Sequence, residues 1–212
     1  MGDALGAPFE FQRPGLYRST YPEPVLTGLG EMRGGGGFGW KPAEFTDDTQ
    51  MALALAESLI ARRGFDAGDL WNRWQVWARR ARDVGVHTRE VLDEKSHVGA
   101  AERVHNRRGK SAGNGSVMRN TPFALWAAEA SLESLVELAV GQASLTHYDP
   151  HNSSGAAIHA AMIRAGIGGG NVFDAIEQVL DILPAAARER WTPLLASGWQ
   201  PDTSVPNGTV WA

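Results

Sequence analysis

The 212-residue chain contains no cysteine, which excludes disulfide bonds, thiolate metal sites and cysteine nucleophiles. It has no apolar run near the ~18 residues that span a bilayer, and its first residues lack the charged start of a signal peptide. Basic residues form only short pairs such as Arg79-Arg80, and 20 Lys and Arg against 24 Asp and Glu give a net charge of −4. This pattern argues against nucleic-acid binding. We therefore expect a cytoplasmic protein that binds neither nucleic acid nor membranes.

Helical patterns fill most of the chain after residue 46. Ala, Leu and Met dominate residues 50–60, and Trp71, Trp74 and Trp77 recur every three residues, which is typical of one packed helix face. A tryptophan stripe can stack nucleobases, but it is more often core, and we interpret it as packing. Further helices are expected at residues 70–80, 88–94, 98–107, 116–129, 131–145, 154–166, 172–183 and 185–196. The sequence predicts an all-α, single orthogonal helical bundle over residues 1–212.

Glycine and proline are concentrated before this helical region. Residues 2–8 form a dense turn signal, and residues 12–45 are rich in Gly and Pro, with four consecutive glycines at 34–37. We therefore expect a turn followed by a long irregular loop, and loops of this length are often functional or mobile.

An acidic cluster marks the start of the first long helix. Thr46, Asp47 and Asp48 offer a hydroxyl and two carboxylates, the oxygen ligands that suit Mg²⁺ or Mn²⁺. The alternative is a helix N-cap followed by an acidic first turn. Glu10 follows the early turn signal and could converge on the same place, although alone it would be a surface carboxylate.

Residues 113–122 place glycines directly before a predicted helix. Such a segment can direct backbone N–H groups at a phosphate without a lysine. It is not a P-loop, because no Gly-Lys-Ser/Thr follows. The alternative is a plain helix–helix turn with Ser116 as the cap.

Residues 145–152 gather polar side chains between two helical patterns. The segment contains His147, Tyr148, Asp149 and His151. A lone histidine here would usually be structural, and this density of polar side chains is a signal for ligand contact. The spacing from His147 to His151 suits a helical metal pair, but Pro150 interrupts the helix and argues against zinc.

Asp83 follows the tryptophan-rich helix. It could be a general base or lie close to a metal ion, and the alternative is a turn-forming aspartate before Gly85.

Taken in order, these segments resemble the ADP-ribosylglycohydrolase family, and most closely its bacterial dinitrogen-reductase-activating type. The resemblance covers residues 2–157. The matching segments are GDALGAPFEF (2–11), FTDDTQMALALAESL (45–59), DVGVHTREVL (83–92), GNGSVMRNTP (113–122) and SLTHYDPHNSSGAA (144–157).

The resemblance implies an all-α fold with two Mg²⁺ or Mn²⁺ ions near the ribose of the substrate. By matching position, the metal ligands would be Thr46, Asp47 and Asp48. The catalytic carboxylates would be Glu10, which could also contribute to the metal site, and Asp83. The residues contacting the ADP-ribose, chiefly its diphosphate and the adjacent ribose, would be Gly115, Ser116 and His147.

The family normally carries a second acidic segment of the Asp-Thr-Asp-Thr kind, which completes the metal pair. Asp202-Thr203-Ser204 is the nearest string here, but it lacks the second acid. The helix that usually precedes the Gly-Asp-Ala-Leu-Gly turn is replaced by Met1. We therefore expect a chain truncated at both ends, with a half-built metal site.

The resemblance implies divalent-metal-dependent hydrolysis of the glycosidic bond between ADP-ribose and a modified protein side chain or small acceptor. The partner would be an ADP-ribosylated protein or a small ADP-ribose conjugate. The alternatives are a module that binds ADP-ribose or a nucleotide without catalysis, and a structural relative. They remain open because the second acidic motif is missing.

Overall fold

A computed structural model describes residues 1–23, 30–196 and 208–210, and within these ranges the chain is all-α, as predicted. The described residues form eleven α-helices and two short 3-10 helices. In these ranges β-pairing is limited to isolated bridges between Gly35 and Trp40 and between Gly113 and Thr209. The elements are α1 (Gly2–Gly6), η1 (Ala7–Phe9), α2 (Leu16–Thr20), α3 (Asp47–Arg62), α4 (Ala67–Ala78), α5 (Val86–Leu92), α6 (Ala100–Arg108), η2 (Asn114–Ser116), α7 (Thr121–Trp126), α8 (Leu132–Ser144), α9 (Pro150–Ile167), α10 (Val172–Ile182) and α11 (Ala185–Leu194).

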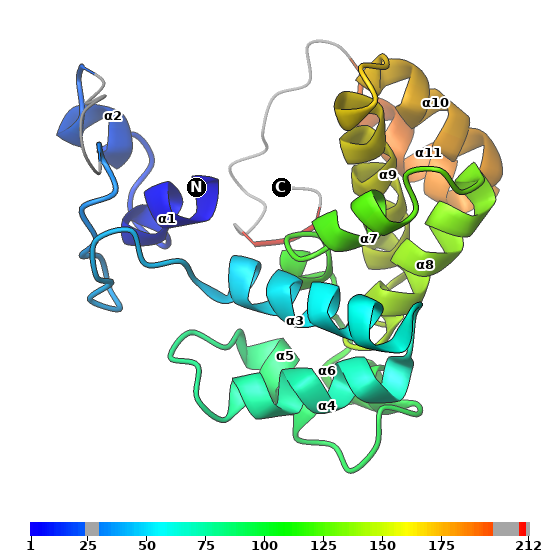
Figure 1. Ribbon diagram of the computed structural model, residues 1–212, viewed down its shortest axis with the longest axis horizontal. Coiled ribbons are helices and arrows are strands. Elements are labelled where there is room, and N and C mark those ends of the chain that lie inside the picture. Colours follow the sequence, from blue (N-terminus) through cyan, green and yellow to red (C-terminus); the bar gives the residue numbers. More distant parts are fainter. Residues whose placement is uncertain (24–29, 197–207, 211–212) are drawn as a thin grey trace.

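The helices pack into two groups around two apolar clusters. Figure 1 shows α3 to α6 together in the lower part of the view and α8 to α11 together at the upper right. Helix α7 lies between the groups, with Phe123 in the apolar cluster of the α3–α6 group and Ala124 in that of the α8–α11 group. Helices α1 and α2 lie to the left, beyond the start of α3.

The α8–α11 group is built around α9, whose buried face consists of small residues. Gly155, Ala156, Ala157, Ala160 and Ala161 are all buried. A Cβ added at Gly155 would lie 2.8 Å from Val210 and 3.1 Å from Trp191, so the glycine permits close contact there. The small face therefore brings the neighbouring segments close to α9.

The α3–α6 group confirms that the tryptophan stripe is largely core. Trp71 and Trp74 are 3% and 0% exposed, and Trp74 also donates from Nε1 to the carbonyl of Met51 on α3. Trp77 lies at the edge of the group and donates to Gln50 Oε1 over 2.6 Å. Buried aromatic area of this kind fixes α4 against α3.

Several helices begin at a side chain of the type that is preferred at the N-cap position. Asp66, Ser131, Asp149 and Asn171 accept backbone N–H groups at the starts of α4, α8, α9 and α10. Pro150 occupies the first position of α9, where its missing N–H costs nothing.

Four sequence predictions were wrong in detail. The dense turn signal at 2–8 is instead helical, and the irregular segment at 12–45 contains α2. The helix expected at 116–129 is reduced to α7, because residues 114–120 form η2 and tight turns. The helix expected at 154–166 begins earlier, at Pro150, because Asp149 caps it.

The glycine tract is docked onto the N-terminal helices. Gly36 has φ +70°, and an added Cβ would lie 2.6 Å from the carbonyl oxygen of Pro8 in η1. Neither the backbone angle nor the space admits a side chain. The tract therefore holds the segment that carries Glu10. No helix among the described residues is long and apolar enough to cross a membrane.

Candidate active site

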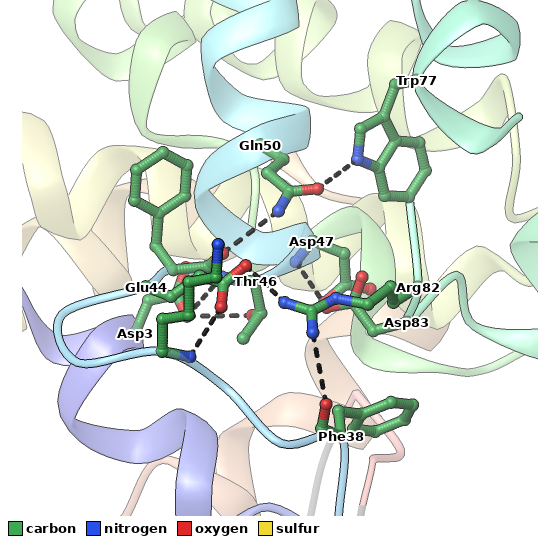
Figure 2. A network of polar contacts seen from close by, with 11 residues as sticks. Asp3, Phe38, Glu44, Thr46, Asp47, Gln50, Trp77, Arg82 and Asp83 are labelled. Carbon is green, nitrogen blue, oxygen red and sulfur yellow. Dashed lines mark hydrogen bonds and ion pairs between the residues drawn. The ribbon is translucent and has the colours of Figure 1, made fainter. Parts of the chain in front are cut away.

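The start of α3 is capped by two aspartates from distant parts of the chain. Asp3 accepts from the backbone N–H of Thr46 at 3.0 Å and of Thr49 at 3.1 Å, and Asp83 accepts from the backbone N–H of Asp47 at 3.0 Å. Figure 2 shows Asp3 and Asp83 reaching this helix start from opposite sides. Helix N-termini attract carboxylates because their first N–H groups have no partner within the helix.

Thr46 is the N-cap residue of α3, and Asp47 and Asp48 occupy its first turn, as the alternative interpretation predicted, but the Thr46 hydroxyl makes no capping hydrogen bond. The hydroxyl donates instead to Asp3 Oδ1 at 2.9 Å and lies 3.3 Å from Asp48 Oδ2. Because Asp3 and Asp83 satisfy the helix start, Asp47 and Asp48 are not needed as caps. Both line the adjacent cleft.

The cluster holds several carboxylates with raised pKa values. Burial, followed by the charge of Asp83, raises the pKa of Asp47 to about 8. Burial is also the main cause of the raised pKa of Asp48, Asp83 and Glu10, with repulsion from neighbouring carboxylates adding to it. Such a group of acids is costly unless protons or a cation neutralise part of it.

Arg82, which precedes Asp83, contacts the loop formed by residues 38–44. Its guanidinium pairs with Glu44, donates to the carbonyl of Phe38 at 3.3 Å and lies 4.7 Å from the Trp40 ring centroid. Figure 2 shows these contacts to Glu44 and Phe38 next to the start of α3. Arg82 thereby holds residues 38–44 against the acidic cluster.

A cleft of about 860 Å³ joins the acidic cluster to the glycine loop. The structure thus brings together most of the residues that the sequence singled out. The predicted site residues in its wall are Glu10, Thr46, Asp47, Asp48, Asp83, Gly115 and His147.

The glycine loop lies across the cleft and packs against His147. A Cβ added at Gly115 would lie 3.1 Å from Cε1 of His147, and one at Gly113 would lie 3.5 Å from Nε2. Asn114 donates its backbone N–H to the carbonyl of Gly208 at 2.7 Å. The loop leads into the three-residue η2 rather than a helix, so the expected helix N-terminus is absent there.

Ser116 lies beneath the cleft rather than in its wall. It is fully buried, its hydroxyl accepts from Asn152 at 3.2 Å, and its carbonyl accepts from Gln142 at 2.7 Å. The side chain therefore supports the loop from behind. His147 precedes α9 and His151 lies in its first turn, so they are not successive turns of one helix.

The oxygen donors of Thr46, Asp47 and Asp48 match the chemistry of a hard divalent cation. Within residues 1–23, 30–196 and 208–210, however, no three Asp, Glu, His or Cys side chains converge to hold a metal ion. The Asp202-Thr203-Ser204 string lies outside the described residues. The donor chemistry fits the ion, while the described ligands form only part of a coordination shell.

Sequence reasoning missed Asp3 and Arg119. Asp3 lies in the glycine-rich segment that was read as a turn, and its capping role depends on a contact 43 positions away in the chain. Arg119 is fully buried beside Trp74, and burial lowers its pKa to about 9. A single arginine in the helix predicted at 116–129 gave no signal of this position.

Known proteins are similar to this chain in sequence and in fold. The ADP-ribosyl-dinitrogen reductase glycohydrolase of Rhodospirillum rubrum is 35% identical over 173 residues, which cover 80% of this chain and 55% of that protein. The ADP-ribosylarginine hydrolase Tri1 of Serratia proteamaculans is 31% identical over 160 residues, covering 72% of this chain and 40% of that protein. The chain thus spans about half the length of these relatives.

A solved structure described as an ADP-ribosylglycohydrolase-related protein complex has a TM-score of 0.69 and 27% sequence identity. The match covers 99% of this chain and 67% of the solved chain. The sequence profile of the family described as ADP-ribosylglycohydrolase matches residues 1–207. On this match across nearly the whole sequence, the chain belongs to the ADP-ribosylglycohydrolase family.

Proposed function

We propose that this chain carries the catalytic cleft of a divalent-metal-dependent hydrolase that releases ADP-ribose from a modified side chain or small acceptor. The observation that carries the proposal is the single cleft in which an acidic cluster faces a glycine loop and His147. Family membership and the names of the relatives support the same reaction.

The glycine loop and His147 would hold the ADP-ribose moiety. Gly113 and Gly115 leave the backbone unobstructed at the cleft wall, which suits close approach of a diphosphate. Ser116 would maintain the loop from beneath. Holding the ligand at this point orients its distal ribose toward the carboxylates on the other side of the cleft.

The carboxylates would carry the chemistry at the ribose. Cleavage of a glycosidic bond passes through an oxocarbenium-like transition state, whose positive charge nearby carboxylates stabilise. The pKa values of Glu10 and Asp83 are raised, mainly by burial, which brings them closer to the range useful for accepting a proton from water near neutral pH. Either carboxylate oxygen could take that proton.

Thr46, Asp47 and Asp48 would hold the Mg²⁺ or Mn²⁺. When bound, the ion would neutralise part of the cluster and orient ribose hydroxyl groups. These three residues would supply part of its coordination shell.

The acceptor would occupy a second groove of about 600 Å³ between α3 and α4. Arg82 and Asp83 line both this groove and the cleft, so the two spaces meet beside a proposed catalytic carboxylate. The groove would then leave room for a protein segment next to the proposed site of cleavage.

The experiment is release of ADP-ribose from an ADP-ribosylarginine peptide, measured by chromatography with Mg²⁺, Mn²⁺ or EDTA. We expect metal-dependent release that Asp48→Asn and Glu10→Gln reduce by about 10²-fold or more. Glu133→Gln, which changes a distant acid in the first turn of α8, is the matched control and should retain activity. Release that is unaffected by EDTA and by both cleft variants would refute the proposal.

A module that binds ADP-ribose without turnover is the second candidate. It is favoured by the incomplete coordination shell among the described residues. Calorimetry that finds ADP-ribose binding without dependence on divalent ions, together with no turnover, would select it.

A further inference from the structure

A buried row of three side chains lies behind the glycine loop and ends at His147. Nη2 of Arg119 donates to Oγ1 of Thr146 at 2.7 Å, and the same oxygen lies 2.8 Å from Nδ1 of His147. Arg119 and Thr146 are 0% exposed and His147 is 2% exposed. Water therefore does not compete for these contacts.

One arrangement of donors and acceptors gives every proton in this row a partner. A guanidinium has no acceptor, so Thr146 must accept from Arg119. The threonine hydroxyl has one proton to give. Among the residues that the structure describes, Nδ1 of His147 is the acceptor within its reach. Accepting from an Nδ1–H as well would leave this buried hydroxyl proton without an acceptor among the described residues. The arrangement that pairs it has Nδ1 unprotonated and the proton of a neutral ring on Nε2.

The surroundings keep the ring neutral. Burial, the positive charge of Arg119 and the nearby His87 hold the pKa of His147 well below its usual value. A neutral ring carries one N–H, and the row determines which nitrogen bears it.

Nε2 of His147, which has no hydrogen-bond partner among the described residues, lies at the cleft wall beside the glycine loop. A Cβ added at Gly115 or Gly113 would lie 3.4 Å or 3.5 Å from it, and His147 is part of the cleft wall. We propose that Arg119 and Thr146 are positioning residues that hold His147 as the Nε2–H tautomer. His147 thereby offers a neutral hydrogen-bond donor to an oxygen of the ligand, and identifying that ligand as ADP-ribose rests on the proposed function.

The environment of Arg119 supports a role beyond packing. Its other polar contacts are to neutral groups: Gln142 Oε1 at 2.9 Å, the Gln142 carbonyl at 3.2 Å and Met51 Sδ at 3.8 Å, with the Trp74 ring centroid 3.9 Å from Cζ. The charge of Asp47 acts on Arg119 without a direct contact. No ion pair to Arg119 occurs within the described ranges. A buried guanidinium without a bonded carboxylate is costly, and a neutral side chain could fill the space. Arginine differs from such a side chain because it can only donate, so Thr146 always accepts at this contact.

Thr146 also orients a second histidine in the same cleft. Its backbone carbonyl lies 2.8 Å from Nε2 of His87, which must therefore be the protonated nitrogen of that ring. The His87 and His147 ring centroids are 4.8 Å apart. One threonine thus fixes the tautomers of two neighbouring rings, through its hydroxyl and through its carbonyl.

Nitrogen-15 NMR of histidine-labelled protein tests the proposal, because long-range ring couplings report the tautomer directly. The chain has 6 histidines, and a His147→Gln variant assigns the relevant signal. We expect Nε2–H for His147 in the wild type and loss of this single tautomer in Thr146→Val. Thr146→Ser, which keeps the hydroxyl, should restore it. Thr192→Val removes a threonine hydroxyl on α11 and is the matched control, which should keep the wild-type signal.

Calorimetry with ADP-ribose provides the functional readout. We expect Thr146→Val to weaken binding by ~5–30-fold, the effect of one or two kcal/mol, with recovery in Thr146→Ser. An Nδ1–H tautomer in the wild type would overturn the proposal, as would a Thr146→Val protein that keeps both tautomer and affinity. Thermal melts confirm that each variant is folded.

These measurements separate this inference from the proposed function. A fixed Nε2–H tautomer that depends on Thr146, in a protein without hydrolase activity, would retain the inference and refute the proposed function. A Thr146→Val protein that releases ADP-ribose and has an unchanged His147 tautomer would refute the inference and retain the proposed function.

Discussion

Replacing Asp47 with asparagine should stabilise the metal-free protein. Asparagine keeps the size of the side chain and removes one charge from the crowded start of α3. The folded protein raises the pKa of Asp47 from 3.8 to about 8, mainly through burial, so folding at neutral pH requires uptake of a proton. A pH of 7 lies ~3 units above 3.8, and each unit corresponds to about 1.36 kcal/mol. The cost of this proton uptake at pH 7 is therefore at most about 4 kcal/mol.

We expect Asp47→Asn to raise the free energy of unfolding by ~1–4 kcal/mol at pH 7 in EDTA, which is at least about 2 °C in Tm. The gain should shrink as the pH falls toward 3.8, because the aspartate is then protonated in both states. Circular dichroism melts over this pH range measure it. Asp174→Asn, at an exposed acid in the first turn of α10, is the matched control and should give no gain. A neutral or destabilising Asp47→Asn at pH 7 would refute the electrostatic reasoning.

Three further predictions concern the same cleft. Asp3→Ala should lower the free energy of unfolding by ~2–4 kcal/mol in urea titrations, opposite in sign to Asp47→Asn, because it removes the acceptor for Thr46 and Thr49. Gly115→Ala should weaken ADP-ribose binding at least ~10-fold in calorimetry by crowding the cleft wall, whereas Gly166→Ala, with open space around it, should not. The Tm in EDTA should fall as pH rises toward 8, because carboxylates with raised pKa values lose stabilising protons, and Mg²⁺ or Mn²⁺ should reduce this fall. Equal slopes with and without metal would contradict the last expectation.

The sequence predicted the long helices and most of the cleft because their signals are local. Ala- and Leu-rich runs predicted α3 correctly, and the tryptophan spacing predicted the buried face of α4. The family motifs also named most of the cleft residues.

The misses depend on contacts between distant residues. The Gly2–Gly6 segment has a turn-like composition, yet it is the helix α1. Its Asp3 bonds to the start of α3, a contact that its local sequence does not reveal. Ser116 has the local pattern of a cap, but Asn152 on α9 holds it beneath the cleft. Arg119 lies in a turn and is buried because Trp74 on α4 and Gln142 on α8 contact it, which spacing along one segment cannot reveal.

The capping of α3 by Asp3 and Asp83 has a consequence for the order of folding. The two caps lie 43 and 36 positions from the N–H groups that they satisfy, so neither is available to the helix while it forms locally. Helix α3 can nucleate in its Ala- and Leu-rich middle, but its first turn stays frayed until both distant loops close. The carboxylate site would then assemble after the main folding barrier. Substitutions at Asp3 should therefore accelerate unfolding while leaving the folding rate nearly unchanged.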